Sequence, residues 1–449
     1  MGIHNMNIKL RVLSLCLLAM AVLLPVASAT TSQPLSARQQ AVELDAILAE
    51  RFATIAPALM RREGIDMWLL ISRENNEDSV LMTMLPSDWF KARRRTMLML
   101  FDRGIDENGI DRGVETIAVA RYNVGEVFKS AWDPEQQPDQ WQRLVELIVE
   151  RQPQRIGVNQ SAGFAAADGL IATEKETLLA YLPAPYQQRL TSAENLAVGW
   201  LETRTAAEIK YYQDAVGWAQ QVIAEGFSDA VIELGVTTTT DIEWWMLERI
   251  YSLNLGAWFP PTVTLQRQGD SNPRLTNAVV QAGDLLHVDI GVTYMRLNTD
   301  TQQHAYVLRA GETAVPASLE RALAAGNQLQ DVLTAEFATQ RSGNDILLSA
   351  LAKAKQQGLR PSIYSHPIGY HGHAVGPTIG MWDQQRAIPV TGEYPLYANT
   401  AHSIELNNTF YSDDWQQDVV IMLEESSWFD GQQVHYLHGR QQQFHLIRE

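Results

Sequence analysis

Cysteine is almost absent from this chain of 449 residues, in which Cys16 is the only thiol. A single cysteine excludes a disulfide framework, a zinc site built from cysteines, and thiol catalysis. Positive charge is also scarce, because 35 Lys and Arg face 52 Asp and Glu and leave a formal net charge of −17. Nucleic acids and anionic lipids attract proteins through positive charge, so we expect neither as the main partner.

Histidine is missing from a long part of the chain, since none lies between His4 and His287. Any chemistry that needs an imidazole therefore belongs to the second half. The Gly-x-Ser-x-Gly elbow of serine hydrolases and the His-Glu-x-x-His helix of one class of zinc enzymes are absent as well. Apolar residues make up 46% and charged residues 19%, which is an ordinary globular composition.

The first thirty residues have the pattern of a secretory signal peptide. Lys9 and Arg11 precede an apolar run at 12–24, and small residues follow at 27–29. This order is typical of a cleaved signal, so we expect cleavage after Ala29 and a signal peptide over residues 1–29. The alternative is an uncleaved membrane anchor, although the run is short for a membrane span. Cleavage predicts a secreted, most simply periplasmic, protein without membrane attachment.

The remaining chain is predicted to form two domains, at residues 30–200 and 201–449. Apolar residues recur at helical spacing over 36–60 and again over 141–150. Apolar stretches typical of strands lie at 65–71, 96–101, 116–120 and 155–159. Strands that alternate with helices predict an α/β domain with a mixed or mostly parallel sheet.

The second domain is predicted to be α+β. Thr205 and Glu208 have the spacing of a capping box, which predicts a helix that ends at Gly235, and Thr240 with Glu243 predicts the next helix start. Further helical patterns lie at 319–337 and 345–357. Strand patterns lie at 285–292, 304–308, 400–407 and 419–425.

One strand of the second domain carries an acid inside an apolar run. Asp289 shares a face of this strand with His287, and Asp300 follows eleven residues later, just before the next strand. Burial of a lone carboxylate costs roughly several kcal/mol unless a cation or hydrogen-bond donors meet it. A hairpin of this length would bring both acids to one pocket. The alternative is that Asp300 is a turn residue and Asp289 accepts backbone donors.

The same pattern occurs in two later strands. Glu405 lies in the first of them, and the second ends with Glu424 and Glu425, where both faces are apolar and alternation does not decide which acid points inward. The loop between 365 and 373 has the densest histidine cluster of the chain, which consists of His366, His371 and His373. Repulsion would force most of these acids to protonate unless they surround metal ions.

These residues resemble the metal site of the pita-bread metallopeptidases, which include methionine aminopeptidase, aminopeptidase P and prolidase. Asp289 in Val-Asp-Ile-Gly, followed by Asp300, is similar to the family's paired aspartates, and His366 and His373 match its two histidines seven residues apart. The similarity covers residues 201–430. The preceding region resembles the creatinase-type amino-terminal domain of aminopeptidase P and prolidase, so the resemblance implies a creatinase-like α/β domain followed by a pita-bread α+β domain.

The resemblance also implies a set of five metal ligands, which are Asp289, Asp300, His366, Glu405 and Glu424. Asp289 would bind one divalent ion, His366 and Glu405 the other, and Asp300 and Glu424 would bridge the pair. Four carboxylates and one imidazole suit Mn²⁺, which we expect, or Co²⁺ or Zn²⁺ as alternatives.

The activity that the resemblance implies is hydrolysis of a peptide bond by a hydroxide that bridges the two ions. The enzyme would be an exopeptidase or dipeptidase of the Xaa-Pro aminopeptidase or prolidase type, with a small peptide as substrate. Glu405 would carry the proton and His373 would contact the substrate. We expect His304 to line the same pocket. Family members often form dimers, so a homodimer is expected.

Some alternatives stay open. His371 is an alternative to His366 as a ligand, and His287 is expected in the core rather than in catalysis. Residues 267–274 lack the histidine that the family places there, Ala374 follows His373 where some members carry an acid, and Met422 stands where an arginine commonly precedes the last glutamate. Two other functions therefore remain, a catalytically silent binding protein of this fold and a creatinase-like amidinohydrolase. Enzymes of the creatinase type lack the ligand set, whereas all five residues are present in this sequence.

Overall fold

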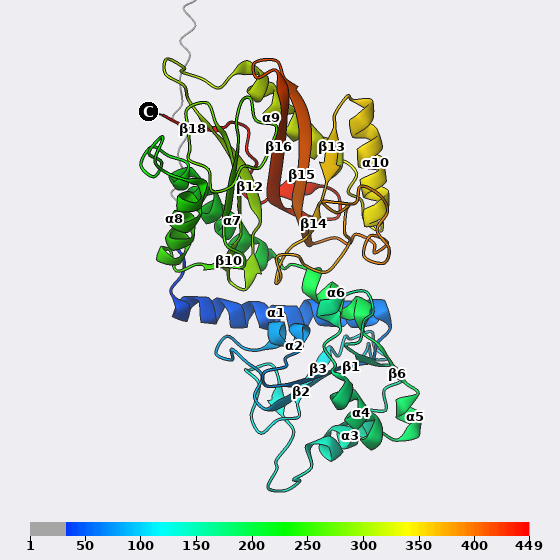
Figure 1. Cartoon of the computed structure of the whole chain (residues 1–449). Helices are drawn as coiled ribbons and strands as arrows, with labels where there is room; N and C mark the ends of the chain where they lie inside the picture. The colour runs from blue at the N-terminus through cyan, green and yellow to red at the C-terminus, as the bar shows by residue number, and fades with distance from the viewer. Residues whose placement is uncertain (1–32, 449) are drawn as a thin grey trace, which may run out of the picture. The chain divides into compact units, whose positions relative to one another are not determined.

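A computed structural model describes residues 33–448, which contain two large β-sheets and the helices that pack on them (Figure 1). The predicted signal peptide lies outside the described residues, and the predicted domain boundary at residue 200 stays a prediction. Within 33–448, no helix has both the length and the hydropathy that crossing a membrane requires.

The first sheet has six strands in the order β4-β3-β2-β1-β5-β6. β1 is antiparallel to β2 and parallel to β5, so the sheet is mixed, as predicted. The strands are β1 (Met67–Arg73), β2 (Arg95–Asp102), β3 (Val114–Ala118), β4 (Lys129–Ser130), β5 (Ile156–Val158) and β6 (Leu190–Ser192).

The helices around the first sheet begin with a long one, α1 (Ala37–Glu63). A capping box of Ser36 and Gln39 begins it, and Gly64, in the left-handed conformation with φ 61°, ends it. Its apolar face, which includes Phe52 and Leu59, is buried in the core. The others are α2 (Ser79–Met84), α3 (Gln140–Arg151), η1 (Ala165–Ala167), α4 (Ala172–Tyr181), α5 (Ala184–Gln187) and α6 (Glu194–Glu202).

The second sheet has nine strands, of which six follow the order β13-β15-β16-β12-β9-β8, and a small sheet has the order β11-β10-β7. The strands are β7 (Gly256–Ala257), β8 (Thr262–Gln266), β9 (Leu285–Ile290), β10 (Val292–Tyr294), β11 (Leu297–Asn298), β12 (Thr301–Val307), β13 (Pro361–Ile363), β14 (His366–Pro367), β15 (Thr400–Ser412), β16 (Gln417–Phe429), β17 (Val434–Tyr436) and β18 (His445–Ile447). The helices are α7 (Ala206–Gly226), α8 (Thr239–Ser252), α9 (Ala317–Thr334) and α10 (Gly343–Gln356).

Two helix ends differ from the prediction. The capping box of Thr205 and Glu208 begins α7 as expected, but the helix ends at Gly226 rather than at Gly235. The next helix, α8, begins two residues earlier than predicted, because Thr238 rather than Thr240 is its N-cap and Asp241 completes the capping box. Glu243 does not cap this helix, since its carboxylate accepts a hydrogen bond from the backbone N–H of Val263 instead.

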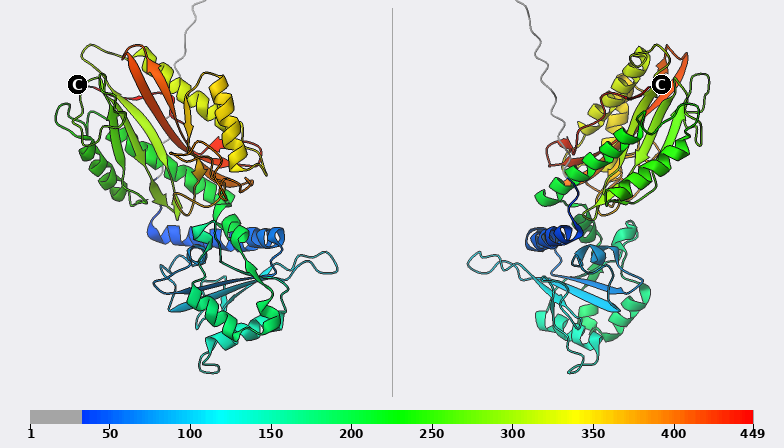
Figure 2. Two further views of the ribbon diagram at one scale, coloured as in Figure 1. Left: turned by 45° about the vertical axis from the view of Figure 1, so that its right-hand side comes forward. Right: turned by 90° about the vertical axis from the view of Figure 1, so that its left-hand side faces the viewer.

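Helices cover one face of the second sheet. Leu286, Val288 and Ile290 of β9 pack in one apolar cluster with side chains of α7 and α8. Ile421 and Leu423 of β16 pack in another with α9 and α10, the yellow helices that lie along the long strands β15 and β16 in Figure 2. Alternation along each strand therefore turns the intervening residues toward the opposite, uncovered face.

The register of four neighbouring strands lines up four polar residues on that uncovered face. Asp289 of β9 pairs with Gln302 of β12, Gln302 pairs with Glu424 of β16, and Glu424 pairs with Glu405 of β15. Residues that are paired directly across antiparallel strands have side chains about 5 Å apart on one face. We call these four residues the polar row. It positions the site described below.

A buried ion pair connects α1 to the second half of the chain. The Arg51 guanidinium donates to the Glu208 carboxylate at 2.8 Å, and the Tyr370 hydroxyl donates to the same carboxylate at 2.7 Å. Tyr370 belongs to the histidine loop, whose backbone carbonyls at Gly369 and Tyr370 also accept hydrogen bonds from the Asn298 amide. The loop that carries the histidines is therefore held from several elements.

A second buried acid lies at the end of α6. Glu202 accepts a hydrogen bond from the Tyr394 hydroxyl at 3.1 Å, while its other carboxylate oxygen has no hydrogen-bond partner. Burial raises the pKa of Glu202 to about 8, and the Arg62 charge opposes part of that rise. The folded protein therefore retains a proton on Glu202 that the unfolded chain releases near pH 4.5.

We predict that Glu202→Gln makes the free energy of unfolding fall less steeply as pH rises. In the native sequence the folded state binds the extra proton, so Glu202 makes the free energy of unfolding fall as pH rises from about 4.5 to about 8. Glutamine keeps the shape and cannot ionise, so the fall should be smaller. Urea unfolding at several pH values measures this, with Glu107→Gln at an exposed position as the control. Equal pH profiles for both variants would contradict the assignment.

Candidate metal centre

The five residues of the expected ligand set come together in space. Three of them belong to the polar row, and Asp300 and His366 lie next to it. Their ligand atoms form groups within 4.8 Å of one another, and these groups overlap. Asp300 lies immediately before β12 and reaches the same space as its neighbours on β9 and β16. The three groups are Asp289 with Asp300 and Glu424, His366 with Glu405 and Glu424, and Asp300 with His366 and His373.

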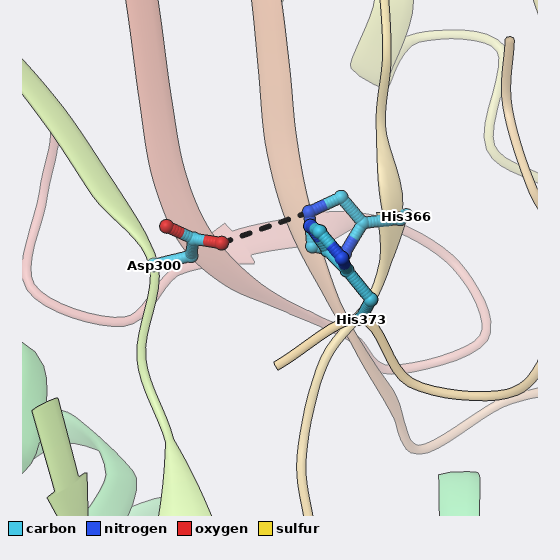
Figure 3. Close-up of side chains that lie close together, drawn as sticks. All are labelled: Asp300, His366 and His373. Carbon is cyan, nitrogen blue, oxygen red and sulfur yellow. Dashed lines mark ion pairs between the residues drawn. The ribbon is translucent and has the colours of Figure 1, made fainter. Parts of the chain in front are cut away.

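The imidazole of His366 is oriented toward the acids. Its Nδ1 lies 2.9 Å from the Pro367 carbonyl, to which it donates, so Nε2 is left with a free lone pair. That Nε2 lies 3.5 Å from Glu424, 3.8 Å from Asp300 and 3.9 Å from Glu405, and Figure 3 shows it facing Asp300. It is buried and has no hydrogen-bond partner. A ring held in this way by a backbone carbonyl is typical of a metal ligand.

The acids of the centre are hard to ionise without a cation. Burial raises the pKa of Asp289, Asp300 and Glu405 well above the usual range of a carboxyl group, and the nearby charge of Glu424 adds to each rise. One oxygen of Asp289 and one of Asp300 are buried without a hydrogen-bond partner. Buried oxygens without a partner, in a cluster that also contains the unpartnered Nε2 of His366, fit the binding of divalent cations.

The structure separates Glu424 from Glu425. Glu424 faces the centre, where its Oε1 accepts a hydrogen bond from the Ser403 hydroxyl at 2.6 Å. Glu425 points to the other face of β16 and accepts the backbone N–H of Gln441 at 2.8 Å. Burial raises the pKa of Glu425 to about 8, so this carboxyl holds a proton at neutral pH. The sequence pattern left this choice open.

The two remaining loop histidines lie beside a cavity of about 430 Å³. His371 and His373 line it together with residues 163–166, which flank η1 near the first sheet. His373 is exposed, and its ring stands edge-on to His366 with the ring centres 4.8 Å apart (Figure 3). His371 belongs to none of the ligand groups among residues 33–448. The geometry thus favours His366 over His371 as a ligand and leaves His373 open to the cavity.

Trp258 forms a wall next to His373, and no local sequence pattern indicates this position. Its indole N–H donates to the Thr299 carbonyl at 2.7 Å, and its ring lies 5.3 Å from that of His373. The ring leaves no space for side chains at Gly291 and Gly372, where a Cβ atom would approach it to 2.1 and 2.3 Å. These two glycines are therefore explained by the close approach of Trp258 rather than by backbone conformation.

The structure does not place His304 at the pocket. It is completely buried, its Nδ1 lies 3.0 Å from the Leu286 carbonyl, and its Nε2 accepts the backbone N–H of Met422. Burial lowers the pKa of His304 to about 4, so the ring stays neutral. With both ring nitrogens bonded to backbone, our prediction of a substrate contact for His304 was wrong. The position of a histidine on a strand near an acid does not determine which groups its ring contacts in the folded protein.

Two further residues beside the acids were missed from the sequence. The Gln302 amide nitrogen donates to Glu405 at 3.0 Å and to Glu424 at 2.6 Å. The exposed Arg274 reaches Met422, with its Nη2 3.2 Å from the sulfur. Its charge opposes, in part, the rise in pKa that burial causes at Glu405. Neither side chain follows from a local pattern, because each contacts strands distant in sequence.

Comparison with known proteins supports a peptidase. The model of metallopeptidase family M24 matches residues 211–428. A search of curated proteins found no match. Among solved structures, an X-Pro aminopeptidase from Thermotoga maritima matches with a TM-score of 0.59 at 16% identity, over 87% of this chain and 100% of that one.

Two other solved structures are similar over comparable lengths. A Xaa-Pro dipeptidase from Bacillus anthracis has a TM-score of 0.55 at 14% identity and covers 92% of this chain and 100% of its own. A dipeptidase from Mycobacterium ulcerans has a TM-score of 0.56 at 17% identity and covers 90% of this chain and 99% of its own. At these identities the likeness establishes the fold, and it confirms the predicted two-part pita-bread architecture.

The family match covers the strands that carry all five expected ligands, and the geometry there suits divalent cations. Both findings support a metal-dependent peptidase. Residues 211–428 match the model of metallopeptidase family M24, and this match agrees with the family that the five expected ligands resemble.

Proposed function

We propose that this protein is a Xaa-Pro peptidase of the aminopeptidase or dipeptidase type that uses two divalent ions, with Mn²⁺ as the expected metal. The observation that carries the proposal is the overlap of the ligand groups. Glu424 is common to the group with Asp289 and to the group with His366, and Asp300 likewise belongs to two groups. His366 also belongs to two groups, but only a carboxylate has two oxygens with which to bridge two ions, so Asp300 and Glu424 suit the bridging positions. The similarity to an X-Pro aminopeptidase and to a Xaa-Pro dipeptidase supports the prolyl specificity.

The proposed roles follow from where each side chain lies. Asp289 would hold one ion, and His366 with Glu405 the other. Two ions held here would supply an activated, bridging hydroxide for attack on the scissile carbonyl. Glu405 lies at the edge of the centre and is less buried than Glu424, which suits a group that carries a proton between water and product. His373 faces the cavity and would donate a hydrogen bond to the substrate.

The proposed activity predicts metal-dependent release of the residue that precedes proline. Xaa-Pro dipeptides and Xaa-Pro-containing tripeptides should be hydrolysed after Mn²⁺ is added to metal-free protein, and a chelator should abolish the reaction. Chromatography of the products distinguishes dipeptidase from aminopeptidase activity. Creatine and Xaa-Ala peptides serve as controls for the two related specificities. Absence of product from the whole Xaa-Pro panel, in protein that carries metal, would refute the prolyl assignment.

The bridging role of Asp300 predicts a loss of both ions in Asp300→Asn. An amide cannot supply the second anionic oxygen that a bridge between cations requires, so metal content should fall from about two ions per chain to near zero. Elemental analysis measures this, and circular dichroism verifies that the variant is folded. Asp270→Asn, at an exposed loop position, is the matched control. Retention of the full metal content by Asp300→Asn would show that the bridging assignment is wrong.

From the position and charge of Arg274 we predict a preference for substrates with a free carboxyl terminus. Arg274 is an exposed cation beside Met422, two residues before Glu424, and lies in the loop that lacks the family histidine. Arg274→Gln should raise KM for Xaa-Pro dipeptides about tenfold, the worth of one charge-assisted hydrogen bond, and change kcat little. Xaa-Pro amides, which lack the carboxylate, should be unaffected. Arg112→Gln near the first sheet is the control, and equal effects on acids and amides would contradict this role.

A further inference from the structure

Gln302 is the only uncharged member of the polar row, and it lies inside the row rather than at its end. Its register partners are Asp289 on one side and Glu424 on the other. Gln302 is buried, with an exposed fraction of 5%. A fourth acid at this position would add repulsion among buried carboxyls, whereas an amide can donate to them.

The hydrogen bonds of Gln302 determine which way its amide points. Its nitrogen lies 3.0 Å from Glu405 Oε1 and 2.6 Å from Glu424 Oε2, and carboxylates accept hydrogen bonds. The amide oxygen therefore faces the other way, toward His287 Nε2 at 2.8 Å. Because an amide oxygen only accepts, His287 must donate from Nε2. Its Nδ1 is then free to accept from the Thr264 hydroxyl, 3.4 Å away.

The same contacts divide the oxygens of the two glutamates. Gln302 binds Oε1 of Glu405 and Oε2 of Glu424. The other oxygens, Glu405 Oε2 and Glu424 Oε1, are those that lie 3.9 and 3.5 Å from His366 Nε2. One oxygen of each carboxyl group is thus held by the amide, and the other is turned toward the imidazole.

We propose that Gln302, itself held by His287, is a positioning residue that orients Glu405 and Glu424 for metal binding. This inference rests on the proposed function, since it assigns the amide a role toward the ions. His287 was expected to be a core residue. The structure gives it a more specific place, at the start of a chain of hydrogen bonds that ends on two ligands. Partners of ligands typically change metal affinity by about 10- to 100-fold when they are removed.

The next residue along the strand supplies a matched control. Gln303 is also 5% exposed, and its amide oxygen also lies 2.8 Å from a histidine, His445 Nε2. It pairs with Val288 and points to the opposite, helix-covered face of the sheet. Gln302→Met and Gln303→Met therefore remove the same amide from equally buried sites, and only the first site faces the acids. Methionine has nearly the volume of glutamine, so both variants should fold.

The test measures Mn²⁺ binding to metal-free protein by calorimetry. Gln302→Met should bind Mn²⁺ at least about tenfold more weakly than the unaltered protein, and Gln303→Met within roughly twofold of it. Thermal unfolding of the metal-free variants shows whether both substitutions have the same structural cost. Gln302→Asn, with a shorter amide that cannot reach both glutamates, should bind as weakly as Gln302→Met.

A second measurement does not involve metal or activity. The ¹⁵N chemical shifts of the His287 ring in metal-free protein report which nitrogen carries the proton. We expect the Nε2–H form in the unaltered protein and in Gln303→Met, and loss of that preference in Gln302→Met. An Nδ1–H form in the unaltered protein would overturn the proposed chain of hydrogen bonds.

The outcomes separate this inference from the function on which it rests. If the unaltered protein binds Mn²⁺ and the Gln302 and Gln303 variants bind it equally well, the positioning role is refuted and the metal site stands. If the unaltered protein binds no divalent ion, the proposed function fails and the positioning role fails with it. Selective weakening in the Gln302 variants, together with the Nε2–H form of His287, supports both.

Discussion

Repulsion among buried carboxyl groups is the constraint that shapes this site. Asp289, Asp300, Glu405 and Glu424 share one buried space beside the imidazole of His366, whose Nε2 lies 3.5 to 3.9 Å from Glu424, Asp300 and Glu405. Burial and mutual repulsion raise the pKa of three of these groups, so protons or cations must compensate the charge. Divalent ions would compensate this charge, which is why we explain the cluster by metal binding rather than by fold stability.

The rest of the second sheet provides the geometry that this constraint requires. Register across β9, β12, β16 and β15 sets three acids and one amide in a row, and the helices cover only the opposite face. Hydrogen bonds from Ser403 and Gln302 fix the rotamer of Glu424, and the Pro367 carbonyl fixes the ring of His366. Three of the expected ligands, Glu405, Glu424 and His366, are thus held by partners that are not themselves expected ligands, which reduces the reorganisation that binding a cation requires.

The surroundings of the centre depart from the family pattern in ways that are connected in space. The position two residues before Glu424 is Met422, and the loop that lacks the family histidine places Arg274 directly against it. Trp258 fills the space beside His373 and is matched by two glycines. The expected ligand set therefore lies in surroundings that differ from the family pattern, and the substitution of Arg274 examines how those surroundings would hold a substrate.

A resemblance to a known family supplied the five expected ligand positions. The sequence by itself indicated most of the longer strands and helices, and the acids and histidines placed among them, because apolar periodicity and polar residues inside it are local signals, whereas short strands such as β4, β7 and β14 have no such signal. It did not decide between Glu424 and Glu425, placed His304 wrongly, and gave no role to Gln302. Those questions depend on which face of each strand the helices cover and on the register between strands, including β12 and β16, whose paired residues Gln302 and Glu424 are more than one hundred positions apart. Alternation says that two faces exist, and only tertiary packing decides which one is buried against helices and which one meets the acids of the neighbouring strands.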